Sequence, residues 1–174
     1  FGSIVASGPN TANPHAVPSD RVIEKGDFVL MDYGAGYCDY RSDMTRTVVI
    51  GEPTQEQLDL YALVRRTHEE CVAAIHPGVE GNDIFKLSKK IIGDAGYGDY
   101  YNHGLGHGVG IDIHELPNFN RSKNTIEIGS VVTMEPGVYL PGVGGVRLED
   151  YGVVTENGYE PFTKTPHDLH VIDC

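Results

Sequence analysis

The chain has 174 residues, a length that suits one domain built around a single core. Its 13 basic and 25 acidic residues give a net charge of -12, which argues against a nucleic-acid partner and an anionic membrane surface. No apolar run approaches the roughly 20 residues that a membrane span requires.

Three cysteines, Cys38, Cys71 and Cys174, are widely spaced and form no C-x-x-C pair. This usage predicts free thiols in a reducing compartment rather than a disulfide framework or a zinc knuckle. We therefore expect a cytoplasmic protein.

Residues 9–20 are a polar, proline-rich loop whose conspicuous side chain is His15. A lone loop histidine is more often a solvated surface group than a functional one. Residues 26–34 and 40–50 are apolar runs separated by a Gly/Asp-rich turn, which predicts a β-hairpin.

Each strand of this expected hairpin contains an aspartate, Asp32 in the first and Asp43 in the second. Aspartate is depleted in strands, and two facing like charges destabilise a sheet. A cation between the two carboxylates would remove that penalty. The alternative is that Asp43 pairs with Arg41 or Arg46 while Asp32 caps the turn.

Residues 54–75 predict a helix that begins with a capping box, Thr54 and Gln57. Its expected inner face carries Leu58, Tyr61, Val64, Cys71, Val72 and Ile75. A second helix is expected from about residue 82 to residue 95, with Ile84, Leu87, Ile91 and Ile92 inward. Neither helix contains a chemical motif, so both are expected to cover the sheet, with Glu69 and Glu70 in solvent.

Residues 103–114 contain His103, His107 and His114 among the alternating glycines of H-G-L-G-H-G-V-G. Glycine at every second position predicts extended backbone packed closely against another layer. With two glutamates that follow in apolar surroundings, Glu135 and Glu149, these imidazoles are what a divalent-cation site requires. The alternative is a flexible glycine-rich loop with solvated histidines.

The segment G-S-V-V-T-M-E-P-G (129–137) repeats the pattern of G-D-F-V-L-M-D-Y-G (26–34), so that Glu135 corresponds to Asp32. The next apolar run of each half contributes another acid, Asp43 or Glu149. We interpret this as an internal repeat of one metal-ligating hairpin, which would direct four carboxylates at one point. Residues from 151 on predict a strand, an N-G turn and a closing segment, and His167 and His170 are expected at the surface.

Six segments carry a resemblance to a known family: S-G-P-N-T-A-N-P-H, D-Y-G, S-D-M-T-R-T, H-G-L-G-H-G-V-G-I-D-I-H-E, M-E-P-G-V-Y and G-G-V-R-L-E-D. They closely resemble the Xaa-Pro metallopeptidases, prolidase and aminopeptidase P, which share the pita-bread fold with methionine aminopeptidase. The resemblance implies an α+β fold with a curved antiparallel sheet, a pseudo-two-fold repeat and covering helices. It also implies that residues 1–174 form a single catalytic domain that lacks its front segment.

The resemblance implies a dinuclear metal centre with five ligands: Asp32, Asp43, His107, Glu135 and Glu149. In the family, the positions of Asp43 and Glu149 bridge both ions. The position of Asp32 chelates one ion, and those of His107 and Glu135 bind the other. Oxygen-rich ligation suits Mn, while Co or Zn could also occupy such a site.

The family also assigns roles around the metals. The position of Glu135 serves as proton shuttle, and His15, His103 and His114 correspond to catalytic and substrate-binding groups, with His114 contacting the developing oxyanion. Arg147 lies beside the bridging glutamate in sequence and would orient it, and we also count it among the substrate-binding residues. The implied reaction is hydrolysis of the peptide bond between an N-terminal residue and proline in small peptides, by a chain that forms a homodimer at full length.

Two departures from the family pattern concern substrate length and the pocket rim. Members of the family normally have a helical segment and an N-terminal domain before the strand that corresponds to residues 1–8, and we expect residues 1–174 to lack both. L-P-N-F-N-R-S (116–122) replaces the usual Pro-Arg-hydrophobic-Ser, which leaves Arg121 as a possible carboxylate-binding group. Alternative functions are a methionine aminopeptidase, a non-catalytic pita-bread interaction module and a metal-free creatinase-like hydrolase. Retention of all five ligands argues against the last two.

Overall fold

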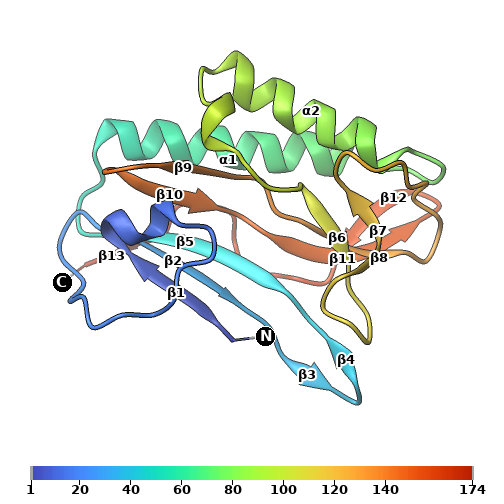
Figure 1. Ribbon diagram of the computed structural model, residues 1–174, viewed down its shortest axis with the longest axis horizontal. Coiled ribbons are helices and arrows are strands. Elements are labelled where there is room, and N and C mark those ends of the chain that lie inside the picture. The colour runs from blue at the N-terminus through green and yellow to red at the C-terminus, as the bar shows by residue number, and fades with distance from the viewer. Residues whose placement is uncertain (1, 174) are drawn as a thin grey trace.

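Antiparallel strands form two main sheets, as the apolar runs and glycine-rich turns predict (Figure 1). The computed structural model describes residues 2–173. The first sheet has the order β1-β2-β5-β13 and consists of β1 (Ile4–Ser7), β2 (Phe28–Tyr33), β5 (Met44–Ile50) and β13 (Val171–Ile172). The parallel pairing of β13 with β5 is the exception to the antiparallel arrangement expected for this sheet.

The second sheet has the order β12-β11-β8-β6-β7. Its strands are β6 (Gly106–Gly108), β7 (Glu115–Phe119), β8 (Val131–Met134), β11 (Asp150–Thr155) and β12 (Gly158–Pro161). Two hairpins complete the strands: β3 (Gly36–Tyr37) with β4 (Tyr40–Arg41), and β9 (Gly137–Leu140) with β10 (Gly144–Arg147). The N-G turn between β11 and β12 lies where the sequence predicts it.

The expected internal repeat is visible in the strand connections. β1 pairs with β2 and β2 with β5 in the first sheet, just as β6 pairs with β8 and β8 with β11 in the second. The two sheets meet where Thr45 forms a β-bridge with Glu149, whose N–H donates a 3.1 Å hydrogen bond to the carbonyl of Thr45. This junction brings the acids of both halves to the middle of the molecule.

The register corrects one detail of the predicted hairpin. Asp32 lies in β2 opposite Thr45, whereas Asp43 immediately precedes β5 instead of lying within the strand. The two aspartates are therefore not a cross-strand pair. Their convergence comes from the strand ends, where a side chain need not obey the alternation of the ladder.

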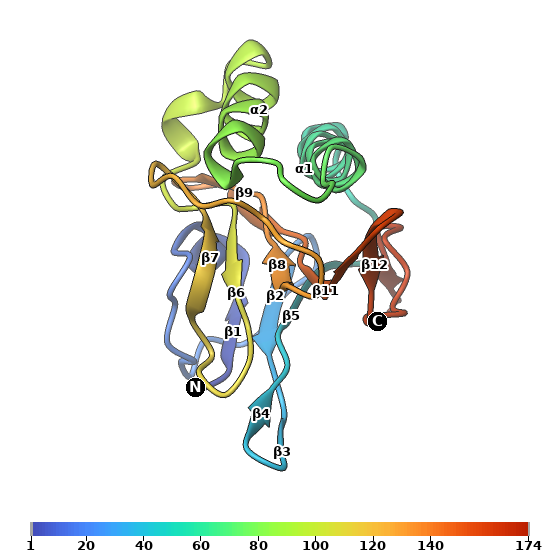
Figure 2. The same ribbon diagram turned by 90° about the vertical axis from the view of Figure 1, so that its right-hand side faces the viewer.

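Two helices lie on one side of the sheets, and the β3–β4 hairpin projects from the opposite side (Figures 1 and 2). α1 (Gln55–Ala73) begins with the predicted capping box, in which Thr54 Oγ1 accepts from the backbone of Gln57 and the Gln57 side chain accepts from the backbone of Thr54. α2 (Gly81–Asp94) follows, and two short 3-10 helices are η1 (Gly8–Ala12) and η2 (Gly98–Tyr100). No helix in the described part of the chain is long and apolar enough to cross a membrane.

The inner face of α1 differs in part from the prediction. Leu58 is exposed, while Leu60 and His68 are buried. The prediction places Leu58, Tyr61 and Val64 on one face at steps of three residues, but the helix has 3.6 residues per turn, so Leu58 is rotated away from the face that Val64 shares with Leu60. The inner residues of α2 agree with expectation for Ile84, Ile91 and Ile92, and Leu87 is half-buried. Both helices pack with the two sheets around one hydrophobic core, which includes Phe28, Leu60, Ile92, Phe119, Val132 and Leu148.

The glycine-rich stretch confirms close backbone packing at β6. A Cβ atom at Gly106 would lie 2.2 Å from the carbonyl oxygen of Thr133, and one at Gly108 would lie 2.5 Å from that of Leu116. Only residues 106–108 are a regular strand, with a register shift between the two glycines. The absence of side chains at these positions lets β6 lie between β7 and β8 and hold His107 in place.

Candidate metal centre and active-site cleft

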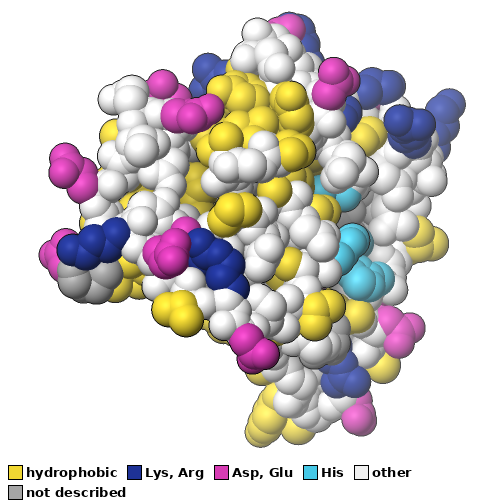
Figure 3. All heavy atoms as spheres, turned by 60° about the vertical axis from the view of Figure 1, so that its left-hand side comes forward, with side chains coloured by type: hydrophobic (Ala, Val, Ile, Leu, Met, Phe, Trp, Pro, Cys, Tyr) yellow, Lys and Arg dark blue, Asp and Glu magenta, His cyan; other side chains and the backbone are white. Residues whose placement is uncertain are grey.

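A cleft of about 480 Å³ opens over the junction of the two sheets. It is lined by nine of the residues that the sequence singles out for chemistry: His15, Asp32, Asp43, His103, His107, His114, Glu135, Arg147 and Glu149. Arg121, expected as a possible carboxylate-binding group, is exposed and is not among the residues that line the cleft. On the face drawn in Figure 3, histidine side chains gather beside a hollow of the surface. The nine residues, far apart in sequence, therefore share one cavity.

The four carboxylates reach the cleft from equivalent points of the two halves. Asp32 comes from the end of β2 and Glu135 follows β8, while Asp43 precedes β5 and Glu149 precedes β11. His107, at the centre of β6, completes the group: its Nε2 atom is 3.3 Å from Glu135 Oε1 and 3.8 Å from Asp43 Oδ2. One ligand atom each from Asp43, His107 and Glu149 lies within 4.8 Å of the others.

Burial and the charges of neighbouring carboxylates oppose ionisation of Asp43, Glu135 and Glu149. Burial and the charge of Asp32 raise the pKa of Asp43 to about 7. Burial also raises the pKa of Glu135 to about 8, with a further contribution from the charges of Asp43 and Asp32, and it raises the pKa of Glu149 well above its usual range. Four acids held this close are a stable arrangement only with protons or cations among them.

The donor set fits divalent cations. The Oδ1 atoms of Asp32 and Asp43 are buried and have no hydrogen-bond partner within residues 2–173, so each is free to bind an ion. Burial lowers the pKa of His107 to about 4, which keeps its imidazole neutral, the form that ligates metals. Two divalent cations would balance four carboxylates, and oxygen with one imidazole suits hard or borderline ions.

Arg147 is buried beside the carboxylates and uses all its nitrogens. Nη2 donates to Asp32 Oδ2 at 2.5 Å, Nη1 donates to the Tyr139 hydroxyl at 2.8 Å and to the Pro14 carbonyl, and Nε donates to Thr45 Oγ1 at 3.1 Å. Its link to Glu149 runs through the Thr45 hydroxyl rather than by direct contact. The guanidinium thus fixes the geometry of the acids.

The three remaining histidines surround the acids at different depths. The His103 imidazole contacts the Tyr139 hydroxyl at 2.9 Å, and burial lowers its pKa to about 4. His114 is exposed, and its ring centroid lies 4.3 Å from that of His107. His15 is exposed, as expected of a loop residue, but it also lines the cleft.

The alternative pairing of Asp43 with a neighbouring arginine does not occur. Within residues 2–173, Arg46 pairs with Asp150 at 2.7 Å, and Arg41 donates to the carbonyl of Asp39. Asp32 pairs with Arg147 instead of capping the turn. The acids of the cleft are therefore not neutralised by the arginines nearest to them in sequence.

Several residues of the site were not identified from the sequence. Thr45 connects Arg147 to Glu149, and Tyr139 connects Arg147 to His103. Asn118 and Asn120 also line the cleft. Thr45 and Tyr139 lie inside the quoted motifs S-D-M-T-R-T and M-E-P-G-V-Y, so their position was a usable signal. The surface expectation for His167 is wrong, because its ring is half-buried against Asp150.

Comparison with known proteins places this geometry in context. The model of metallopeptidase family M24 matches residues 1–156. An Xaa-Pro dipeptidase of Pyrococcus furiosus is 45% identical over 170 residues, which cover 97% of this chain and 49% of that protein. Among solved structures, an Xaa-Pro dipeptidase from Bacillus anthracis has a TM-score of 0.96 at 44% identity, and an X-Pro aminopeptidase from Thermotoga maritima has a TM-score of 0.96 at 38% identity.

Each of these two structures is matched over 99% of this chain and 49% of its own length. The chain thus spans about half the length of the curated relatives it matches. The expected pita-bread fold is confirmed by these structural matches, and the family that the motifs resemble is the one that matches the chain. The chain belongs to metallopeptidase family M24.

Proposed function

We propose that this chain is the catalytic part of a metal-dependent exopeptidase that hydrolyses the bond between an N-terminal residue and proline. The observation that carries the proposal is the convergence of Asp32, Asp43, Glu135 and Glu149 with His107 in one cleft. The relatives named Xaa-Pro dipeptidase support the substrate class. The proline bond has no N–H, so recognition must rest on the carbonyl and the terminal groups.

In this proposal Asp32, Asp43, His107, Glu135 and Glu149 hold two divalent ions. Such ions, when bound, supply a water of lowered pKa and polarise the scissile carbonyl. Mn is our preferred ion because of the oxygen-rich donor set, with Co or Zn as alternatives. Arg147 and Thr45 keep the carboxylates Asp32 and Glu149 in the orientation that ligation needs.

The remaining residues act on the proton and on the peptide. The Glu135 carboxylate accepts a proton from the attacking water and delivers it to the proline nitrogen as the C–N bond breaks. The exposed His114 imidazole donates toward the carbonyl oxygen as negative charge develops there. His15 and His103 contact the bound peptide from the other parts of the cleft lining.

The cleft volume of about 480 Å³ lies in the range of sites for small molecules, which supports short peptides as substrates.

Cys38 and Cys71 are free, which supports our proposal of a cytoplasmic location. We further propose a homodimer for the full-length protein, with no nucleic-acid or membrane partner.

The test combines metal analysis with a substrate panel on one preparation. We expect two Mn ions per chain and hydrolysis of Ala-Pro or Ala-Pro-Ala, with Met-Ala left intact. Cleavage of Met-Ala in preference to both proline peptides would favour the methionine aminopeptidase alternative. Two bound ions without cleavage of any peptide, in a protein of full length, would favour the non-catalytic module.

A further inference from the structure

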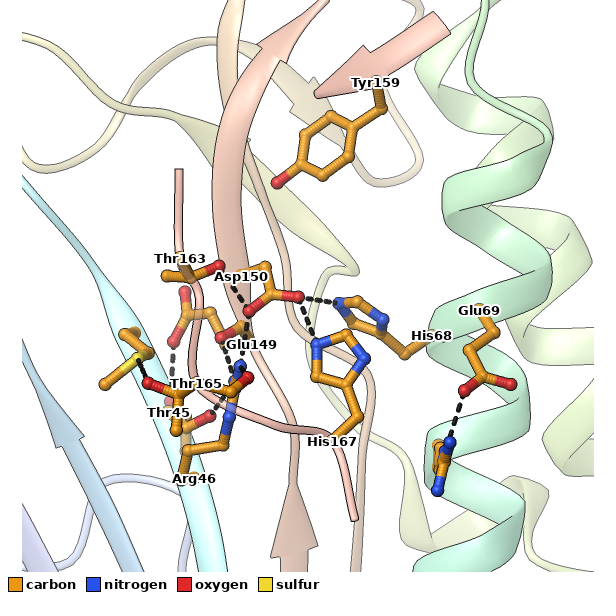
Figure 4. A network of polar contacts seen from close by, with 12 residues as sticks. Thr45, Arg46, His68, Glu69, Glu149, Asp150, Tyr159, Thr163, Thr165 and His167 are labelled. Atoms are coloured by element: carbon orange, nitrogen blue, oxygen red, sulfur yellow. Dashed lines mark hydrogen bonds and ion pairs between the residues drawn. The ribbon is translucent and has the colours of Figure 1, made fainter. Parts of the chain in front are cut away.

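A second group of side chains of the types that bind metals lies on the far side of Glu149 from the cleft, where Asp150 of β11 faces α1. Glu149 and Asp150 are consecutive and point to opposite sides, as neighbours in an extended chain do. Asp150 points toward His68 on α1 and His167 in the C-terminal segment (Figure 4). One ligand atom from each of these three residues lies within 4.8 Å of the others.

The distances within this group are close to those of a metal site. The Nε2 atom of His68 is 3.4 Å from Asp150 Oδ2, and the Nε2 atom of His167 is 2.6 Å from the same oxygen. Bonds of about 2.0–2.1 Å from a tetrahedral zinc ion to its ligands place those ligand atoms about 3.3 Å apart. The first pair already has this separation, and the second is a hydrogen bond that would have to lengthen by less than about 1 Å. His167 lies in irregular chain between β12 and β13, where such a movement is easy.

The Nε2 atom of His68 is a buried polar atom without a hydrogen-bond partner among the described residues. The residue is 2% exposed. An unsatisfied buried polar atom costs about 1–3 kcal/mol in proteins generally, so its retention calls for an explanation. Burial also lowers the pKa of His68 to about 4, which keeps the ring neutral and able to ligate.

The two oxygens of Asp150 have separate roles. Oδ1 accepts hydrogen bonds from Arg46 and from the Thr163 hydroxyl, whereas Oδ2 faces the two imidazoles. The Arg46 guanidinium pairs with Asp150 on the Oδ1 side, where it also donates to the Glu149 carbonyl. Arg46 therefore weakens but does not block cation binding at Oδ2, and it holds the carboxylate in a fixed orientation.

We propose that His68, Asp150 and His167 form a separate site for one borderline divalent cation, represented by Zn²⁺. Two imidazole nitrogens and one carboxylate oxygen are a donor set that zinc accepts, with water in the fourth position from the side of the partly exposed His167. The ion takes the place of the proton between His167 and Asp150. It joins α1, β11 and the C-terminal segment, so its role is to fasten that segment rather than to act on the substrate.

The experiment counts zinc ions per chain after equilibrium dialysis and compares three proteins. His167→Gln keeps a side chain that can donate to Asp150 but removes a ligand. His170→Gln is the matched control, because His170 is an exposed histidine of the same segment and lies outside the cluster. We expect His167→Gln to bind one ion fewer than the unmodified chain, and His170→Gln to bind the same number.

This difference does not depend on the proposed peptidase centre, which contributes equally to all three proteins. Equal zinc content in the unmodified chain and His167→Gln would overturn the proposal, as would an equal loss in His170→Gln. A second measurement uses Asp43→Asn as the background, to disable the cleft. In this variant Zn²⁺ should still raise the melting temperature. In the double variant that also carries His167→Gln, this rise should be abolished. An unchanged rise in the double variant would also overturn the proposal.

Discussion

The hydroxyl of Thr45 donates a 2.6 Å hydrogen bond to Oε2 of Glu149 across the junction of the two sheets. The Thr45 hydroxyl oxygen also accepts a 3.1 Å hydrogen bond from Nε of Arg147, whose Nη2 atom donates to Asp32. One small side chain thus connects a carboxylate from each half of the repeat. The connection explains how carboxylates that repel one another keep a common geometry.

Thr45→Val should therefore weaken metal binding and catalysis without large change in packing, because valine has nearly the shape of threonine. Loss of a group that orients a metal ligand costs about 10- to 100-fold in affinity or activity. The measurements are the Mn dissociation constant and kcat/KM for Ala-Pro.

Thr67→Val is the control for this substitution, since Thr67 is equally buried and, within residues 2–173, its hydroxyl donates only to the Leu63 carbonyl of its own helix. Equal losses in the two variants would mean that Thr45 acts through general stability. A normal Mn affinity in Thr45→Val would show that Glu149 needs no such support.

Substitutions of Glu149 and His114 should separate ligands from pocket residues. Glu149→Gln is expected to release metal, together with activity and with the part of thermal stability that the metal provides. His114→Ala should keep both ions and the fold but lower kcat by roughly 10²- to 10³-fold, about 2–4 kcal/mol, as removal of one oxyanion donor does. Elemental analysis, melting temperature and kcat are measured on both. Metal loss in His114→Ala, or two retained ions in Glu149→Gln, would reverse the assignment.

The stability of the metal-free chain should fall as the pH rises from 7 to 8.5. The pKa of Asp43 is raised from 3.8 to about 7 and that of Glu135 from 4.5 to about 8. The folded chain therefore binds more protons than the unfolded chain, and this stabilisation is lost as the pH passes through the folded-state values. The lowered pKa values of His68, His103 and His107 act in the opposite sense, but mainly below pH 6.5.

The expected decrease in the free energy of unfolding over this interval is about 1–2 kcal/mol, measured by urea denaturation in chelator. Asp43→Asn should reduce the decrease, because an amide cannot ionise and also removes one charge from beside Glu135. Saturating Mn should abolish it. A metal-free chain whose stability is constant or increases from pH 7 to 8.5 would contradict the prediction.

Gly106→Ala should destabilise the chain by about 1–3 kcal/mol, because the added methyl group meets the backbone of β8 and cannot be accommodated by a side-chain movement. Gly93→Ala is the matched comparison: Gly93 lies in α2 with open space around its Cβ position, so alanine there should be neutral or stabilising by up to about 1 kcal/mol. Chemical denaturation measures both. A similar stability of the two variants would show that β6 can shift away from β8.

The sequence by itself determined both long helices, the acid-bearing strands and the residues that line the candidate cleft. The capping box at Thr54 is a local signal and formed as predicted, and the repeated acid-bearing strands identified Asp32 and Glu135 before any contact was known. The alternating glycines around His107 predicted close backbone packing, because only the absence of a side chain permits it. Local chemistry is sufficient for such inferences, since each depends on patterns within short segments of the chain.

Only the tertiary structure decided which groups share an environment. Arg147 contacts Asp32 over 115 positions of sequence, and Arg46 contacts Asp150 instead of the nearby Asp43. The burial of His68 against Asp150 depended on which face of α1 packs inward and on the path of the C-terminal segment. Pairings of this kind arise from how sheets and helices pack. The sequence shows which residues carry charge, but only the packing shows which of them come into contact.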